Sequence, residues 1–100
     1  MQTVNLFNLR KTDDYSFLYD MLDGIEGFES FPSQDECYYV SADESYYNGS
    51  YRIIWNKNGV WYEAEDSHCS CRRWESFDPD EVSEEYVIVT LQRLLGVDKS

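Results

Sequence analysis

The sequence is poor in positive charge. Only 8 lysine and arginine residues accompany 20 aspartate and glutamate residues in a chain of 100, and the formal net charge is −12. A surface this acidic repels nucleic acid and anionic membranes, and it attracts basic protein clefts. We therefore expect neither direct nucleic acid binding nor membrane binding, and we expect a basic protein as the partner.

Long apolar runs are also absent. No window approaches the roughly 20 apolar residues that a membrane-spanning helix requires. The first residues, Met1 to Asn5, lack the basic region and apolar run of a signal peptide. We expect a cytoplasmic protein, and its three cysteines would then be reduced.

Histidine is nearly absent, and this limits the enzyme classes that the sequence could support. A nucleophilic Cys69 or Cys71 would need a base and a low thiol pKa. The one histidine, His68, directly precedes Cys69, and sequence neighbours seldom have the geometry for a side-chain hydrogen bond. Carboxylates are abundant, but a fold this small rarely encloses the pocket in which two of them act as acid and base. We expect no enzymatic activity, no catalytic residue and no cofactor.

Aromatic residues, by contrast, are plentiful. They make up 17% of the chain, and hydrophobic residues make up 42%, close to ordinary globular composition. Each aromatic side chain buries roughly 150–250 Å². The chain can therefore fill a core despite its charge, and its length predicts a single acidic domain over residues 1–100.

A helix is predicted over residues 13–22. Thr12 or Asp13 can act as its N-cap, and Gly24 and Gly27 end it. Its apolar residues recur at helical spacing. They are Phe17, Leu18, Met21 and Leu22.

A second helix is predicted in the C-terminal segment. Asp78 is a suitable N-cap, Pro79 suits the first helical position, and Glu81 completes a capping box. Gly96 is a natural end. One apolar stripe consists of Val87, Leu91, Leu94 and Leu95, and Val82, Tyr86 and Val89 fall on the opposite side. The run 86–90 is also typical of a strand, so a strand remains the alternative there.

The centre of the chain has β patterns. Residues 37–40 read as a strand followed by a turn over 43–45, and residues 1–11 read as a short strand or arm. Residues 51–55 and 60–65 flank Asn58-Gly59, a pair that favours a type I′ hairpin turn. In that register Trp55 faces Tyr62 and Ile53 faces Ala64 on an apolar face, while Arg52 faces Glu65 on the other face. The prediction is an α+β fold: a small antiparallel sheet of three to four strands with an N-terminal helix and a C-terminal helix.

A cluster of zinc-type donors gives an alternative function. His68, Cys69 and Cys71 lie close in sequence, and Cys37 could complete four ligands. The Cys-x-Cys spacing is shorter than the usual gap between zinc ligands, and Cys37 would have to arrive from another strand. We expect no metal, and a small structural domain with a zinc site remains the alternative.

The segment from Ser45 to Cys71 carries a resemblance. An aromatic hairpin is followed here by Asp66-Ser67-His68-Cys69-Ser70-Cys71. This resembles a family of small uncharacterised proteins from tailed phages of actinobacteria, in which a similar hairpin ends in Asp-Ser-Gly-Cys-Ser-Cys. His68 stands in place of the family's glycine, and Arg72-Arg73 stand where a proline usually follows. The resemblance implies a phage origin, hence the host cytoplasm, and no particular mechanism.

Charge and resemblance together suggest a non-enzymatic phage-type accessory protein. It would inhibit or modulate a basic host protein, such as one that binds nucleic acid, through carboxylates that take the place of phosphates. Anti-restriction, anti-CRISPR and repair-inhibitor proteins are the classes concerned, by analogy. The alternative role for the acids is solubility. The expected partner-binding residues lie off the apolar stripes and are Asp13, Asp14, Asp20, Asp23, Glu63, Glu65, Glu81, Glu84 and Glu85.

Overall fold

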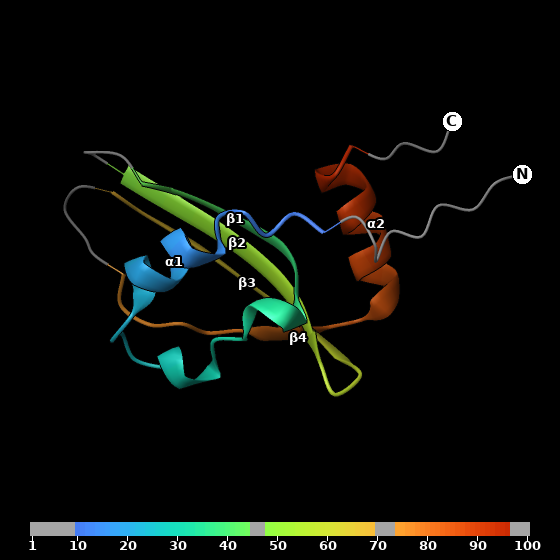
Figure 1. Cartoon of the computed structure of the whole chain (residues 1–100), viewed down its shortest axis with the longest axis horizontal. Coiled ribbons are helices and arrows are strands. Elements are labelled where there is room, and N and C mark those ends of the chain that lie inside the picture. The colour runs from blue at the N-terminus through green and yellow to red at the C-terminus, as the bar shows by residue number, and fades with distance from the viewer. Residues whose placement is uncertain (1–9, 45–47, 70–73, 97–100) are drawn as a thin grey trace, which may run out of the picture.

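The fold is a four-stranded antiparallel sheet with one helix packed on each face. The computed structural model describes residues 10–44, 48–69 and 74–96. The strands lie in the order β1-β2-β3-β4 (Figure 1). The elements are α1 (Tyr15–Leu22), the 3₁₀ turns η2 (Phe28–Ser30) and η3 (Gln34–Glu36), β1 (Cys37–Glu44), β2 (Asn48–Lys57), β3 (Val60–Cys69), β4 (Asp80–Val82) and α2 (Glu84–Leu94). The predicted α+β fold class is confirmed.

The hairpin of β2 and β3 has the predicted register. Trp55 pairs with Tyr62, Ile53 with Ala64, and Arg52 with Glu65. Asn58 and Gly59, at φ 55° and 85°, provide the two left-handed residues that a type I′ turn needs. The prediction of this hairpin is confirmed.

Strand β1 extends further than the sequence indicates. It continues to Glu44, and Asp43 and Glu44 pair with Ser50 and Gly49 of β2. The predicted turn at 43–44 is therefore wrong, because the long β2 provides pairing partners there; Ser45 lies outside the described residues. Of the predicted N-terminal arm, residues 1–9 also lie outside them, and Lys11 forms a parallel bridge to Tyr39.

Helix α1 begins at Tyr15 rather than at residue 13. The carboxylate of Asp14, next to the first turn, does not cap the helix. It instead accepts a hydrogen bond from the backbone N–H of Ala42 at 3.1 Å. Asp14 therefore links α1 to β1, a use of the side chain that capping rules do not anticipate.

Helix α2 also begins later than predicted. Residues 80–82 form β4, where Val82 pairs with Trp61 of β3. Ser83 is the N-cap, and its hydroxyl accepts from the backbone N–H of Tyr86 at 3.1 Å. The predicted start at Asp78, Pro79 and Glu81 is wrong because pairing with β3 holds this segment extended. The helix itself and its buried stripe residues Val87 and Leu91 are confirmed.

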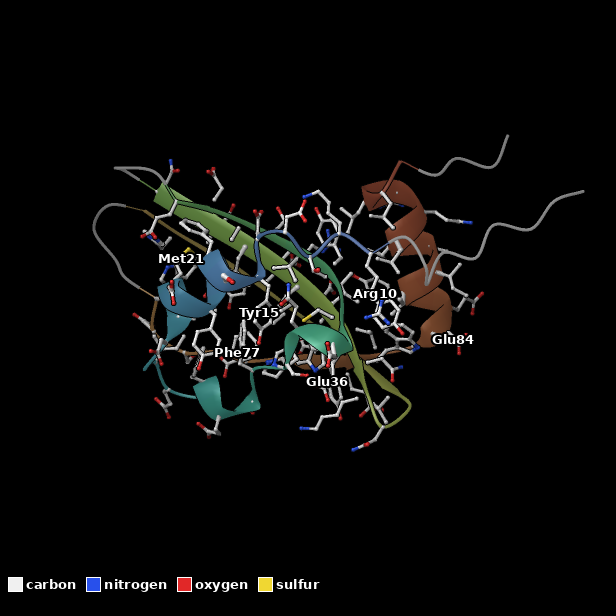
Figure 2. The ribbon with its side chains drawn as sticks, in the orientation of Figure 1. Arg10, Tyr15, Met21, Glu36, Phe77 and Glu84 are labelled. Atoms are coloured by element: carbon white, nitrogen blue, oxygen red, sulfur yellow. The ribbon has the colours of Figure 1, made fainter. Side chains whose placement is uncertain are left out.

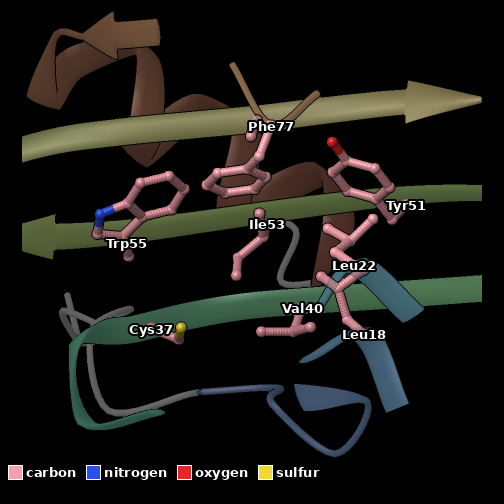
Figure 3. Close-up of a cluster of buried hydrophobic side chains, with 9 residues drawn as sticks. Leu18, Leu22, Cys37, Val40, Tyr51, Ile53, Trp55 and Phe77 are labelled. Carbon is pink, nitrogen blue, oxygen red and sulfur yellow. The ribbon is translucent and has the colours of Figure 1, made fainter. Parts of the chain in front are cut away.

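Two hydrophobic clusters fill the space on the two faces of the sheet. The larger one joins α1 and the 74–79 segment to one face, with Leu18, Ile53, Trp55 and Phe77 buried in it (Figure 3). The smaller one packs Val87 and Leu91 of α2 against the other face. Its remaining buried members are Tyr39, Ile54 and Trp61. The helices consequently lie on opposite sides of the sheet (Figure 1).

The segment before β4 is tied to the loop after α1. The backbone N–H of Phe77 donates to the carbonyl of Glu26 at 2.8 Å. Gly27, at φ 86°, lies so close to the Phe77 carbonyl that a side chain there would meet it. This close approach brings the two loops together at one edge of the larger cluster.

Candidate functional site

Most of the predicted partner-binding acids lie on the surface. Asp14 is half-buried, and Glu63 is only 8% exposed. The exposed residues are Asp13, Asp20, Asp23, Glu65, Glu81, Glu84 and Glu85. Among the predicted acids, only this exposed set can present a carboxylate to a partner.

Glu63 is a correction to the predicted set. One of its carboxylate oxygens lies 2.7 Å from Nε of Arg52, and the other accepts from the hydroxyl of Tyr86 at 2.7 Å. Arg52 also donates to the Tyr86 hydroxyl at 3.2 Å. The side chain of Glu63 projects from the same face of the sheet as Trp61. Helix α2 docks on this face and covers Glu63. It stabilises the contact between sheet and helix and cannot serve as a free surface acid.

Arg52 is shared between two carboxylates. Its directly opposite partner, Glu65, is 4.0 Å away, so the diagonal Glu63 makes the closer pair. Burial alone would lower the pKa of Arg52, but the hydrogen bond and the charge of Glu63 outweigh this and raise it. Arg52 therefore stays charged and neutralises acids within the protein.

Two groups of exposed acids lie apart on the surface. Asp13, Asp20 and Asp23 surround α1, on one side of the sheet. The second group, which we call the acidic strip, follows β4 and the first turn of α2. It consists of Asp78, Asp80, Glu81, Glu84 and Glu85, all exposed. Figure 2 shows Glu84 at the α2 end of the molecule, well away from Met21 on α1. A single partner surface is thus expected to contact one group only.

Two basic side chains close to β1 are directed onto tyrosine rings. The guanidinium of Arg10 lies 4.1 Å from the ring centre of Tyr38, and the ammonium of Lys11 lies 5.9 Å from that of Tyr39. Arg10 also donates to the carbonyl of Asp35 at 2.8 Å. Because Arg10 and Lys11 make these contacts, neither side chain neutralises the acidic strip.

The proposed zinc ligands are not brought together. Cys37 pairs with Trp55 at the start of β1, and Trp55 pairs with Tyr62. His68 lies further along β3, about 20 Å from Tyr62 at roughly 3.3 Å per residue. Cys71 and the side chain of Cys69 lie outside the described residues. Cys37 and His68 therefore cannot bind one ion, and the four-ligand set is not supported.

His68 instead packs beside the loop before β4. Its ring centre is 4.4 Å from that of Trp74 in an edge-to-face contact, and Nε2 lies 3.6 Å from a carboxylate oxygen of Glu44. Within the described residues, no three histidine, cysteine or acidic side chains form a metal-binding group.

Cys37 is predicted to be an unreactive thiol. Burial, supported by the charge of Glu36, raises its pKa to about 12. With Cys69 and Cys71 changed to serine, we expect thiol labelling at pH 8 to be at least about a hundredfold slower in buffer than in urea. Above pH 9 the unfolded thiol ionises while the folded one does not, so stability should fall as the pH rises towards 12. Rapid labelling of the native protein would contradict the burial of this thiol.

The surface depressions could not be predicted from the sequence, because their residues come from separate elements. One of about 420 Å³ lies beside Arg52 and Glu65, where Ser41, Ser50 and Ser67 from three strands line it. Only the strand register brings these hydroxyl groups together.

No described helix is long and apolar enough to span a membrane.

In comparisons with known proteins, no protein-family model matches this chain, and no curated protein or solved structure matches it either.

Proposed function

We propose that this chain is a non-enzymatic, phage-type accessory protein of the host cytoplasm that binds a basic host protein and inhibits or modulates it. The acidic strip is the surface that supports this proposal best. The partner would be a nucleic-acid-binding protein, and the carboxylates of the strip would occupy its phosphate-binding positions. The likeness of residues 45–71 to tailed-phage proteins supports the phage origin.

The geometry of the strip carries the proposal. Glu81 lies on the edge strand β4, and Glu84 and Glu85 lie in the first turn of α2. The helix dipole favours negative charge in that turn. Because Ser83 caps α2, Glu81 has no capping role and is available to a partner.

Salt and competition test the proposal. The tagged protein would capture its target from host lysate at rising salt, with and without short duplex DNA or RNA. We expect capture to fall steeply as salt rises, because exposed charges are screened over about 8–10 Å near physiological ionic strength. We also expect the duplex to compete for the captured protein. Retention at high salt together with no competition would reject the mimicry.

Charge variants then distinguish a specific role of the acidic strip from an effect of the overall net charge. Replacing Glu81, Glu84 and Glu85 by glutamine should slow association with the captured protein about tenfold, because steering depends on long-range charge. The matched control removes the same charge elsewhere, at Glu26, Asp35 and Asp43, all of which are exposed. An equal slowing in both variants would show that the acids act only through net charge, as in a role limited to solubility.

A further inference from the structure

A hollow of about 270 Å³ lies on the outer side of α1. Tyr15, Ser16, Tyr19 and Asp20 line it. Residues one helical turn apart are neighbours on the surface of a helix, so these two pairs face the same side of α1. Ser16, Tyr19 and Asp20 are exposed. This depression, which we call the α1 hollow, therefore combines two aromatic rings with one carboxylate.

The rings of the α1 hollow are anchored to the core. The hydroxyl of Tyr15 donates to the carbonyl of Pro32 at 2.6 Å, and the ring centre of Tyr15 lies 5.5 Å from that of Phe31. Phe31 in turn contacts Phe77 of the larger hydrophobic cluster, with ring centres 5.2 Å apart. A ligand would therefore meet side chains that are already ordered, which lowers the entropic cost of binding.

Tyr19 presents part of its ring to solvent, and its side chain is 41% exposed. Its ring centre is 5.0 Å from that of Phe28 and 5.8 Å from that of Phe31, both in edge-to-face contacts. Because Phe28 and Phe31 stack on each other with centres 5.0 Å apart, both approach Tyr19 from the same side. The contact between Tyr19 and Tyr15, at 6.2 Å, is tilted and not stacked. The exposed part of the Tyr19 ring is therefore accessible to a partner.

The charge along α1 is negative. No lysine or arginine occurs in the sequence between Lys11 and Arg52, whereas Asp20 lies in the last turn of α1 and Asp23 is its C-cap. The helix dipole favours cations at that end, yet the last turn of α1 contains no basic residue. Among the described residues, no basic side chain forms an ion pair or a ring contact with α1. Both the acids and the helix end therefore favour a cation supplied by a partner.

Arginine is the cation that matches a ring beside a carboxylate. Its planar guanidinium stacks on aromatic rings and donates two parallel hydrogen bonds to a carboxylate, whereas the lysine ammonium is a compact point charge. A cation within about 6 Å of a tyrosine ring centre is attracted by the negative face of the ring. A second copy of this chain is a poor occupant, because the net charge of −12 on each copy opposes association.

We propose that the α1 hollow binds an arginine side chain from an exposed segment of a partner protein. The guanidinium would lie on the exposed part of the Tyr19 ring and donate to the carboxylate of Asp20. This proposal depends neither on nucleic acid mimicry nor on the acidic strip. Figure 2 shows Tyr15 of α1 well away from Glu84 of the strip, so the two surfaces can be tested separately.

A peptide titration tests the inference. The probe has three arginines separated by glycine and serine, and the control peptide has lysine in place of each arginine, so the two peptides have equal charge. In NMR spectra recorded near physiological ionic strength, we expect the arginine peptide to shift the backbone signals of Tyr19 and Asp20 in a saturable way. The lysine peptide should bind there about threefold more weakly. Equal binding of both peptides, or shifts confined to the acidic strip, would overturn the proposal.

Two matched variants test the aromatic ring. Tyr19→Leu keeps an apolar side chain but removes the ring, and it should weaken binding of the arginine peptide about twofold to fivefold, as expected for one exposed cation–π contact. Phe17→Leu is the control, since Phe17 is 47% exposed on the same helix and does not line the hollow. Equal effects of the two changes would show that the Tyr19 ring does not bind the peptide.

Charge variants complete the test. Asp20→Asn should weaken binding of the arginine peptide about twofold to fivefold, as expected for one exposed ion pair. Asp13→Asn removes the same charge at an exposed position outside the hollow and should have a smaller effect. Glutamine at Glu81, Glu84 and Glu85 should leave the shifts at Tyr19 in place, which separates this site from the acidic strip. An unchanged affinity in Asp20→Asn, or an equal loss in Asp13→Asn, would reject the hollow as an arginine site.

Discussion

Replacing Phe77 by alanine should lower the free energy of unfolding by about 3–5 kcal/mol. Phe77 is 2% exposed, and its ring contacts Phe31, Tyr51 and Trp55 with centres 5.2, 6.4 and 5.8 Å apart. The change removes buried apolar surface and leaves a cavity where three separate segments meet. In thermal unfolding, the midpoint should fall by roughly 12 °C or more for a domain of this size.

Phe17→Ala is the matched control for Phe77. Phe17 is 47% exposed on α1, so its loss should change stability by no more than about 0.5 kcal/mol. Similar losses in the two variants would contradict the placement of the 74–79 segment against the core.

Replacing Arg52 by alanine should cost about 3 kcal/mol, because it leaves the buried carboxylate of Glu63 without its cation. Removing Glu63 should cost less. Arg52 is 29% exposed at its side chain and keeps Glu65 at 4.0 Å, so its charge can remain solvated and partly paired. Urea unfolding of the two alanine variants measures this asymmetry. Lys57→Ala, at an exposed position of the same strand, serves as the control.

A double variant tests whether the pair acts as a unit. Arg52→Met with Glu63→Leu removes both charges together, and a buried pair can often be replaced by apolar residues at little cost. We expect the double variant to be more stable than Arg52→Ala, with the Tyr86 hydroxyl turning to solvent. If the losses of Arg52→Met alone and Glu63→Leu alone simply add in the double variant, the residues are not coupled.

The same elements that stabilise the fold also position the proposed binding surfaces. Phe77 stacks on Trp55 and holds it within the larger hydrophobic cluster. The Glu63–Tyr86 contact holds the first turns of α2 against the sheet, and Glu84 and Glu85 project from those turns. Variants at Phe77 or Arg52 should therefore affect binding through the position of these surfaces, whereas the surface variants should leave stability nearly unchanged.

Features that depend on near neighbours along the chain could be predicted from the amino-acid sequence. The β2–β3 hairpin follows from Asn58-Gly59 and from side-chain alternation over a few residues on either side, and both are local. The presence of the two helices, and the buried stripe residues Val87 and Leu91 of α2, follow from helical periodicity in the same way. Composition alone determined that the chain is strongly acidic.

Other features depend on long-range packing, because two local solutions compete there or because distant segments meet. Asp78 and Ser83 are both acceptable N-caps, and pairing of Val82 with Trp61 selected Ser83 by keeping residues 80–82 extended. Glu63 and Glu65 are two residues apart in β3, so their side chains project from the same face of the sheet. Glu63 is nevertheless buried, because α2 docks over it. A depression of about 500 Å³ is lined by residues from the 29–30 turn, the hairpin and Pro79, whose proximity is a property of packing and leaves no periodic signal in the chain.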